Sequence, residues 1–161
     1  GLHNRRAFND YLSYLFTQMS RTEQTYAVLL MDIDFFKKVN DSFGHEVGDQ
    51  VLQRVAEILP TTLRITDFVA RLGGEEFIAL LPATTLEGAM HLAEKIRSTI
   101  EQESIIDNHP VSLSIGISLA QVDDADINDA IRRADQCLYR AKQQGRNRVI
   151  SSITDAMDCL A

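Results

Sequence analysis

The sequence is poor in cysteine, and its two cysteines lack the spacing of a metal-binding or disulfide-rich protein. Cys137 and Cys159 lie far apart and belong to no cluster of further cysteines or histidines. Structural zinc sites need grouped ligands, and small secreted scaffolds need many paired cysteines. We therefore expect two inert thiols in the reducing environment of the cytoplasm.

The sequence also lacks a long hydrophobic run. Its longest clearly apolar stretch, Tyr26 to Met31, is much shorter than the roughly 20 residues needed to cross about 30 Å of hydrocarbon. No charged segment followed by an apolar one opens the chain, so no secretory leader is predicted. Because the first residue is Gly1, we expect a cytoplasmic piece of a longer protein, and this sequence does not determine whether that protein is membrane-tethered.

Basic residues are outnumbered, with 16 Lys and Arg against 23 Asp and Glu, for a formal net charge of −7. Proteins that bind nucleic acid broadly normally present a basic face, so this charge balance argues against nucleic acid as a partner. It does not exclude a nucleotide substrate, because a few lysines and a cation can hold a triphosphate on an acidic protein. The length of 161 residues and the apolar content of 45% are typical of one folded domain over residues 1–161.

Hydrophobic periodicity predicts helices at five places along the chain. Gly44 is placed to end the short second helix, and Asp49 is a candidate N-cap for the third. Thr84 and Glu87 form a capping box for the fourth helix, and Asp126 is the candidate cap of the last. The expected helices cover residues 8–19, 36–43, 51–59, 85–103 and 127–141.

Apolar runs between these helices predict five strands. The run at 26–33 is continuous, which suits a buried central strand, whereas the alternation at 113–119 predicts a half-buried one. A short break at 73–76 between the runs 67–72 and 77–81 indicates a hairpin, and 148–150 is a short closing strand. The element order predicts an α/β domain with a mixed central sheet and surrounding helices. Residues 151–161 show no pattern and are expected to form a tail.

Acidic residues gather at the end of the predicted central strand and at the hairpin tip. Asp32 and Asp34 are two residues apart on a strand and face the same side. If the hairpin lies beside that strand, Glu75 and Glu76 join them, and a cation is needed to offset the repulsion. Oxygen ligands suit Mg²⁺. Without further information, acidic residues in such places are more often solvated loop charges than metal ligands. For Asp34, a role as N-cap of the second helix is at least as well supported as a role as metal ligand.

Several motifs together resemble the GGDEF family. The first is GGEEF at 73–77, a variant with Glu in the third position. The others are MDIDFFKKVND at 31–41 with FGH at 43–45 and GD at 48–49, NRR at 4–6 after Gly1 and Leu2, and YRAK at 139–142 followed by GRNR at 145–148. They span nearly the whole chain in the family's order, although the acidic and Leu-Thr elements that normally precede Gly1 lie outside the sequence.

The resemblance implies a fold similar to the palm of nucleotide cyclases and polymerases, with a ferredoxin-like βαββαβ core. It also implies a diguanylate cyclase, which condenses two GTP into cyclic di-GMP and releases two pyrophosphates. Mg²⁺ or Mn²⁺ would be the cofactor. The family's active site forms between two domains that each bring one GTP, so a homodimer is the expected partner state, with an N-terminal sensory or dimerising region elsewhere in the protein.

The resemblance assigns roles to individual residues of this sequence. Metal ligands would be Asp32, the Ile33 carbonyl and Glu75, with Glu75 also acting as the base for the 3′-hydroxyl. Glu76 would be a second acidic catalytic group, and Lys37 would lie near phosphate. Asn40 and Asp49 would contact guanine, and His45 would lie near the nucleotide. Lys142 and Arg146 would bind the outer phosphates.

An RxxD pattern, Arg64 to Asp67, lies before the hairpin at the family's spacing for an inhibitory site. By resemblance, Arg64 and Asp67 would bind the product cyclic di-GMP. Either Lys95 or Arg97 would complete that site. Two alternatives to an active cyclase remain, namely a receptor module for cyclic di-GMP or GTP without catalysis, and a structural interaction domain. The presence of Asp32, Glu75, Glu76, Lys37 and Asn40 argues against loss of activity.

Overall fold

The computed structural model describes residues 2–22, 24–121 and 124–152. The elements follow in the order α1 (Arg5–Thr22), β1 (Tyr26–Ile33), α2 (Phe36–Phe43), α3 (His45–Thr62), β2 (Phe68–Gly73), β3 (Glu76–Pro82), α4 (Leu86–Gln102), β4 (Leu113–Ala120), α5 (Ile127–Gln143) and β5 (Val149–Ser151).

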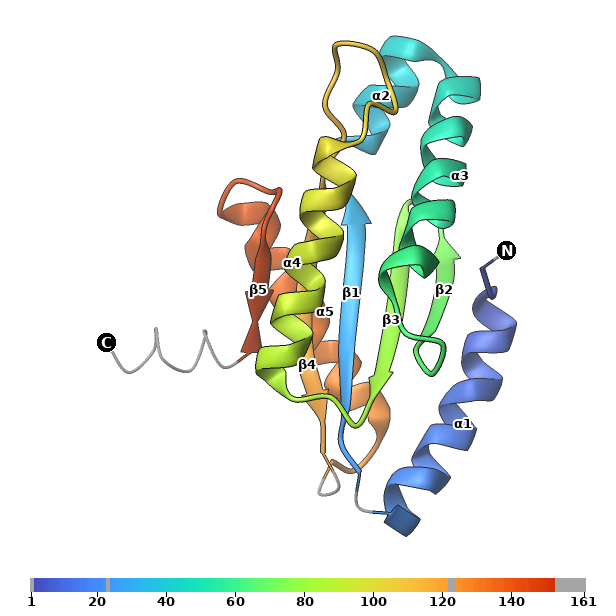
Figure 1. The fold of residues 1–161 in the computed structure, drawn as a ribbon, viewed down its shortest axis with the longest axis vertical. Coiled ribbons are helices and arrows are strands. Elements are labelled where there is room, and N and C mark those ends of the chain that lie inside the picture. Colours follow the sequence, from blue (N-terminus) through green and yellow to red (C-terminus); the bar gives the residue numbers. More distant parts are fainter. Residues whose placement is uncertain (1, 23, 122–123, 153–161) are drawn as a thin grey trace.

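The strands form one five-stranded mixed sheet in the order β2-β3-β1-β4-β5. The central strand β1 pairs antiparallel with β3 and β4, β2 pairs antiparallel with β3, and β5 runs parallel to β4 (Figure 1). The predicted mixed sheet with helices around it is confirmed. Its β1-α3-β2-β3-α4-β4 part has the strand order of a ferredoxin-like core.

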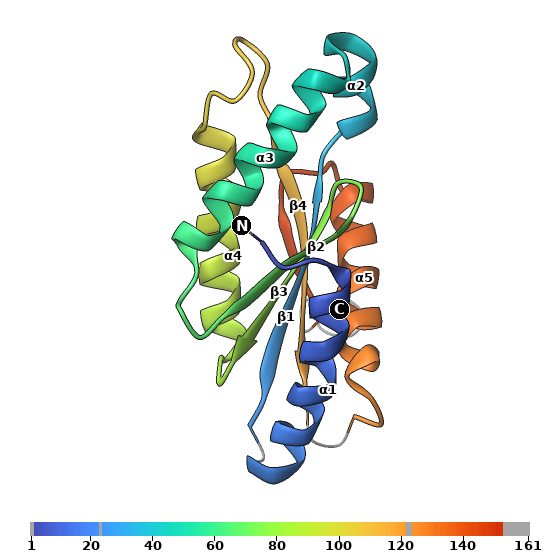
Figure 2. The same ribbon diagram turned by 90° about the vertical axis from the view of Figure 1, so that its right-hand side faces the viewer.

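Helices cover both faces of this sheet. Alternate residues of β1 face opposite sides, so Ala27 and Leu29 join the core under α3 and α4, while Val28 and Leu30 join the core under α1 and α5. Figure 2 shows the two helical layers on either side of the sheet seen edge-on. Every residue of β1 is buried, which explains its continuous apolar run.

The prediction of a half-buried β4 is wrong, because α5 packs directly on its small residues. A Cβ on Gly116 would lie 2.1 Å from the Ala134 carbonyl oxygen of α5. Ser118 is fully buried and donates a hydrogen bond to the Ala130 carbonyl. The serines and the glycine therefore form a second buried face that lets the helix approach closely.

The candidate caps of the second and third helices are also wrong. The helix α3 begins at His45, so Asp49 lies inside it rather than at its N-cap. The N-cap of α2 is Phe35 in a left-handed conformation, with no capping bond from Asp34. The helix α3 thus begins earlier than predicted, whereas α2 covers the predicted residues but lacks the Asp34 cap.

The two later caps were predicted with mixed success. Thr85, and not Thr84, caps α4 by accepting a hydrogen bond from the Gly88 N–H. Asp126 caps α5 as predicted and forms a capping box with Asp129. A one-residue displacement such as that of Thr85 arises because two adjacent threonines carry the same capping chemistry.

The described residues contain no helix long and apolar enough to cross a membrane. Ser151 is buried in β5, so the expected tail cannot begin there, and residues 153–161, with Cys159, lie outside the described part. Cys137 is buried in α5, and burial raises the pKa of its thiol. A buried, protonated thiol is unreactive, as the sequence predicted for this cysteine.

Candidate active site

The end of β1 and the tip of the β2–β3 hairpin lie side by side. Asp32 is the register partner of Glu76, and the Ile33 N–H donates a hydrogen bond to the Glu75 carbonyl at 3.2 Å. The sequence predicted that these carboxylates would meet only if the hairpin lay beside the strand. It does, and Asp32, Ile33 and Glu75 are therefore neighbours.

Asp32 is a buried carboxylate with one unsatisfied oxygen. Asp32 is 7% exposed, and its Oδ2 pairs with the Lys142 ammonium. Its Oδ1 is buried, and none of the described residues donates a hydrogen bond to it. Burial raises the pKa of Asp32, Lys142 opposes that rise, and the nearby Glu75 and Asp34 add to it. An electron-rich oxygen without a donor is suited to accept a cation.

Glu76 shares this acidic surrounding. Burial raises its pKa, and the charges of Asp32 and Asp135 raise it further. Asp135 was not predicted, because its approach to Glu76 depends on how α5 packs against β1 and β4. A cleft of about 600 Å³ opens over this group and is lined by Asp32, Glu76, Asp135, Gln136, Leu138, Tyr139, Arg140, Lys142 and Gln143.

The donors at this cleft fit Mg²⁺ or Mn²⁺ only if substrate and water complete the shell. No three His, Cys, Asp or Glu side chains of the described residues gather around a point able to hold a metal. Asp32, Glu75 and the Ile33 carbonyl would supply oxygen ligands to such an ion, and Mg²⁺ commonly keeps waters and binds substrate phosphates beside one or two carboxylates. The partnerless Asp32 oxygen is the observation that supports this fit.

The polar face of α2 lies against the start of α3. Asn40 is half-buried, and its Oδ1 occupies the space beside Gly48, where a Cβ would lie at 1.9 Å. Any larger residue at that position would displace the Asn40 amide. Asp49 follows directly and is exposed, so the two predicted guanine contacts lie close together, with His45 exposed in the same turns and Lys37 exposed on α2.

The two predicted phosphate-binding cations lie at the end of α5 and just beyond it. Lys142 reaches Asp32, which places it beside the predicted metal ligands. The Arg146 guanidinium lies over the Phe35 ring, 4.5 Å from its centroid, and Lys38 lies 4.8 Å from the same centroid. Phe35 is 50% exposed, and neither its ring nor Lys38 was singled out from the sequence.

Asp34 has a role that neither sequence interpretation anticipated. Its carboxylate accepts hydrogen bonds from the Ser112 hydroxyl at 2.7 Å, the Ser114 hydroxyl at 2.5 Å and the Asn147 N–H at 3.0 Å. Three donors thus hold the Asp34 carboxylate, and it makes no capping bond to α2. The sequence analysis used the serines of this segment only to predict a half-buried strand, and it did not connect them with Asp34.

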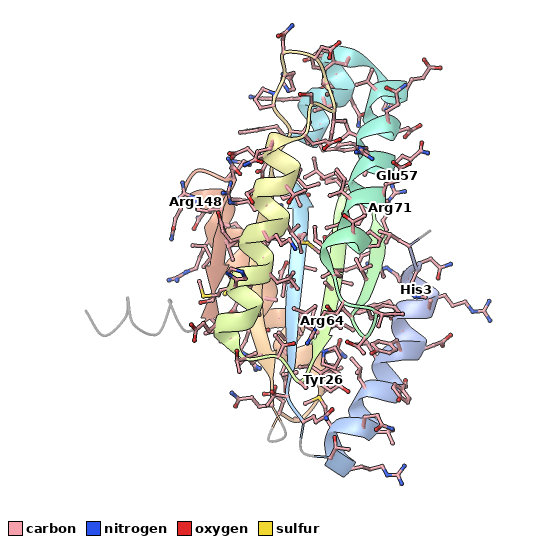
Figure 3. All side chains as sticks on the ribbon, viewed as in Figure 1. His3, Tyr26, Glu57, Arg64, Arg71 and Arg148 are labelled. Carbon is pink, nitrogen blue, oxygen red and sulfur yellow. The ribbon has the colours of Figure 1, made fainter. Side chains whose placement is uncertain are left out.

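The Arg64–Asp67 pair lies at the opposite end of the sheet. Arg64 precedes β2, on the side of the sheet where β1 begins at Tyr26, whereas Arg71 lies towards the hairpin tip (Figure 3). Arg64 donates to Asp67 at 2.8 Å through both its backbone N–H and its guanidinium, and also to the Pro82 carbonyl and the Thr84 hydroxyl.

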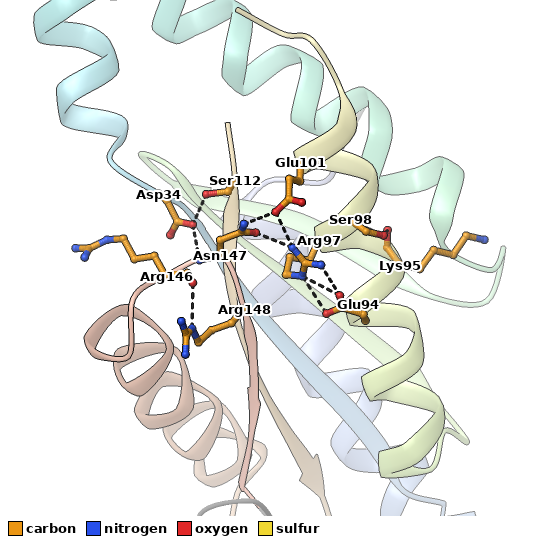
Figure 4. A network of polar contacts seen from close by, with 10 residues as sticks. All are labelled: Asp34, Glu94, Lys95, Arg97, Ser98, Glu101, Ser112, Arg146, Asn147 and Arg148. Atoms are coloured by element: carbon orange, nitrogen blue, oxygen red, sulfur yellow. Dashed lines mark hydrogen bonds and ion pairs between the residues drawn. The ribbon is translucent and has the colours of Figure 1, made fainter. Parts of the chain in front are cut away.

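The two candidates for a third inhibitory residue point away from each other. Arg97 binds Glu94, Glu101 and Asn147, and its side chain is only 15% exposed. Lys95 is exposed and projects from α4 away from that network (Figure 4). The geometry therefore makes Lys95 the more accessible of the two.

Comparison with known proteins identifies this arrangement. The family model described as "Diguanylate cyclase, GGDEF domain" matches residues 1–148. The chain is 43% identical over 150 residues to diguanylate cyclase A of Treponema denticola, covering 90% of this chain and 40% of the relative. It is 40% identical over 156 residues to the response regulator PleD of Caulobacter vibrioides, covering 93% and 34%. The chain thus spans well under half the length of these relatives.

Solved structures agree. The active GGEEF domain of a diguanylate cyclase from Vibrio cholerae superposes with a TM-score of 0.88 at 40% identity, covering 94% of this chain and 98% of that one. The GGDEF domain of DgcB from Caulobacter crescentus, solved with c-di-GMP, superposes with a TM-score of 0.88 at 31% identity, covering 94% and 91%. With its motifs, its fold and its relatives in agreement, the chain belongs to the GGDEF family of diguanylate cyclase domains.

Proposed function

We propose that this domain is an active diguanylate cyclase that joins two GTP into cyclic di-GMP with release of two pyrophosphates. The observation that carries the proposal is the buried Asp32 oxygen that has no donor, beside Glu75 and the Ile33 carbonyl. A protein that had lost catalysis would have no need to keep an unsatisfied buried carboxylate, which costs stability. The family's relatives named as cyclases support the same reaction.

Each residue has a task in this reaction. Asp32, Glu75 and the Ile33 carbonyl hold Mg²⁺ or Mn²⁺, which supplies Lewis-acid stabilisation of the phosphate charge. Glu75 takes the proton of the attacking 3′-hydroxyl, and Glu76, whose pKa is raised, is a second acid able to hold a proton nearby. Lys142, Lys37 and Arg146 bind phosphate oxygens, and Lys142 exchanges Asp32 for phosphate when substrate arrives.

Asn40 and Asp49 select guanine. An amide offers both a donor and an acceptor, and a carboxylate accepts from the N1 and N2 hydrogens of guanine. Gly48 keeps the Asn40 amide in place for this contact, and His45 lies near the bound base. Since each domain binds one GTP, turnover requires two domains that face each other as a homodimer.

The exposed guanidinium of Arg64, held by Asp67, is proposed to bind cyclic di-GMP as an inhibitor, with Lys95 as the third member. The side chain of Arg64 is 51% exposed although it is fixed by four acceptors on neighbouring segments. A pre-oriented fork of this kind suits a phosphate or a guanine edge. The related GGDEF domain of DgcB, solved in complex with c-di-GMP, supports the same ligand class.

The proposal is tested by incubating the domain with GTP and Mg²⁺ over a range of protein concentrations and quantifying cyclic di-GMP by chromatography. We expect a rate that rises faster than linearly with protein concentration, because two domains must meet. Glu75→Ala should abolish product while Glu87→Ala, a matched loss of an exposed glutamate on α4, should not. Absence of product at every concentration, with tight binding of cyclic di-GMP, would establish the receptor alternative instead.

A further inference from the structure

The loop after α5 holds an unusual backbone conformation. Gly145, Arg146 and Asn147 have successive positive φ angles of 122°, 66° and 47°. Glycine adopts such angles without cost, but for other residues the left-handed region costs roughly 1–2 kcal/mol each. Arg146 and Asn147 therefore need contacts that hold them there.

The Asp34 carboxylate supplies the central contact. It accepts hydrogen bonds from the Asn147 N–H at 3.0 Å and from the Ser112 hydroxyl (Figure 4). The Ser114 hydroxyl of β4 donates a third hydrogen bond to it. The Asp34 N–H also donates to the Ser112 carbonyl at 2.9 Å. Asp34 is 6% exposed, so its carboxylate is buried at the end of the sheet and is not a surface charge.

The Asn147 side chain ties the same loop to α4. Its amide nitrogen donates to Glu101, and its oxygen accepts from Arg97 at 2.8 Å. The segment after β1 thus binds the Asn147 backbone, and α4 binds its side chain. Inside the loop, the Arg146 carbonyl accepts from Arg148 at 3.1 Å.

These contacts fix the direction in which the Arg146 side chain points. Its side chain leaves a left-handed residue and lies over the ring of Phe35, the residue directly after Asp34 and itself left-handed at φ 55°. Asp34 and Phe35 therefore fix, respectively, the backbone and the guanidinium of the loop that carries Arg146. Both come from the segment that also carries the metal ligands.

We propose that Asp34 is a positioning residue that acts through Asn147 to aim Arg146 at the outer phosphates of GTP. This inference rests on the proposed function of Arg146 as a phosphate contact. Asp34 itself touches neither substrate nor metal in this arrangement, since Ser112, Ser114 and Asn147 take up its oxygens.

The test is a double-variant cycle read by calorimetric binding of 3′-deoxyGTP with Mg²⁺, which cannot react because it lacks the attacking hydroxyl. Asp34→Ala and Arg146→Ala should each weaken binding about tenfold, and the double variant should be no weaker than either. Guanosine, which has no phosphates, should bind all four proteins within about twofold. Multiplying effects in the double variant, or unchanged 3′-deoxyGTP binding by Asp34→Ala, would overturn the proposal.

Three further variants separate positioning from a fault in folding. Asp34→Asn keeps an oxygen for the Asn147 N–H and should restore binding to within about threefold of the unaltered domain. At Asn147, glycine tolerates the positive φ and alanine does not, so Asn147→Gly should bind 3′-deoxyGTP several-fold more tightly than Asn147→Ala. Equal binding by these two variants contradicts the proposal even if Asp34→Ala does not fold.

Ser114→Ala removes one of the bonds to Asp34, and Ser118→Ala removes an equally buried serine bond that does not reach Asp34. Only the first should weaken 3′-deoxyGTP binding relative to guanosine, and equal effects of the two would count against the inference. If the unaltered domain bound no triphosphate and made no cyclic di-GMP, the proposed function would fail instead. The two failures are therefore distinguishable.

Discussion

Two buried carboxylates at opposite ends of the sheet are satisfied in different ways. Asp32, at the end of β1, has one oxygen paired with Lys142 and one with no partner. The side chain of Asp67, before β2, is fully buried, and Arg64 supplies donors to both of its oxygens. Both carry the same chemical group, yet only Asp32 has an unmet need for positive charge.

This difference separates a site that must gain a cation from one that is already assembled. Charge at Asp32 costs free energy in the folded protein, which is why burial raises its pKa in spite of Lys142. At Arg64 the bond to Asp67 raises the pKa of the guanidinium, so that pair is stable as an ion pair. A ligand at the first site completes it, whereas a ligand at the second must use the exposed half of Arg64.

The largest effect should come from Asp32→Asn. Loss of a charged metal ligand removes several kcal/mol of transition-state stabilisation, so cyclic di-GMP production should fall by about 100-fold or more. The unfolding temperature without metal should not fall, because a charge that the fold disfavours is removed. Product assays and thermal melts without and with Mg²⁺ measure both. A clear loss of stability without metal would show that the Lys142 pair outweighs burial.

The next effect should come from Arg64→Ala at the other end of the sheet. Charge-assisted hydrogen bonds contribute about 1.5–3 kcal/mol, so product affinity should fall roughly tenfold or more. The initial rate, measured before product accumulates, should stay within about twofold because Arg64 is remote from Asp32. Calorimetric binding of cyclic di-GMP and progress curves test this. A parallel loss of the initial rate would mean that the two ends are not separable.

A smaller effect should separate Lys95 from Arg97 on the same helix. Lys95→Ala should weaken cyclic di-GMP binding several-fold, since a single exposed cation contributes about 1 kcal/mol or less. Arg97→Ala should leave product affinity within about twofold, because Arg97 is already bound by Glu94, Glu101 and Asn147. Titration calorimetry of the two variants decides between them, and the reverse order would move the inhibitory site to the other side of α4.

The smallest effect concerns pH and Glu76. Burial and the charges of Asp32 and Asp135 raise the pKa of Glu76, so the folded metal-free protein binds a proton more tightly there than the unfolded chain does. Its stability should therefore rise as pH falls through the folded pKa and fall as pH rises. Glu76→Gln should raise the melting temperature at neutral pH by on the order of 1–3 °C, with no difference at acid pH. Thermal melts over a pH series measure this, and a lower melting temperature at neutral pH would contradict it.

Local sequence patterns were sufficient to predict which segments are helices and which are strands, and to identify the residues of each motif. The continuous run in β1 and the Gly-containing break at the hairpin predicted both structures, because backbone geometry responds to side chains a few residues away. The same reliance on local sequence made the predicted caps at Asp34, Asp49 and Thr84 wrong. Each is a good capping residue in isolation, and tertiary contacts decided which one was used or where the helix began.

The serines of β4 show how far pattern alone extends. Alternation of apolar and small residues correctly predicted a strand, but it also suggested a solvated face, which α5 in fact covers. Serine and glycine occur on solvated strand faces and also where a helix packs closely on a strand, so their alternation with apolar residues does not distinguish the two. Burial on the second face is therefore a property of the assembled layers.

The sequence by itself determined the family, the mixed α/β fold and the set of acidic and basic residues from which the site is built. Only the tertiary structure decided that Asp32 keeps an oxygen without a partner, that Lys142 reaches it across 110 residues of chain, and that Asp34 grips the loop of Arg146 instead of capping a helix. The physical reason is that hydrogen bonding and desolvation depend on which groups are brought within about 3 Å of each other, and long-range packing sets those distances.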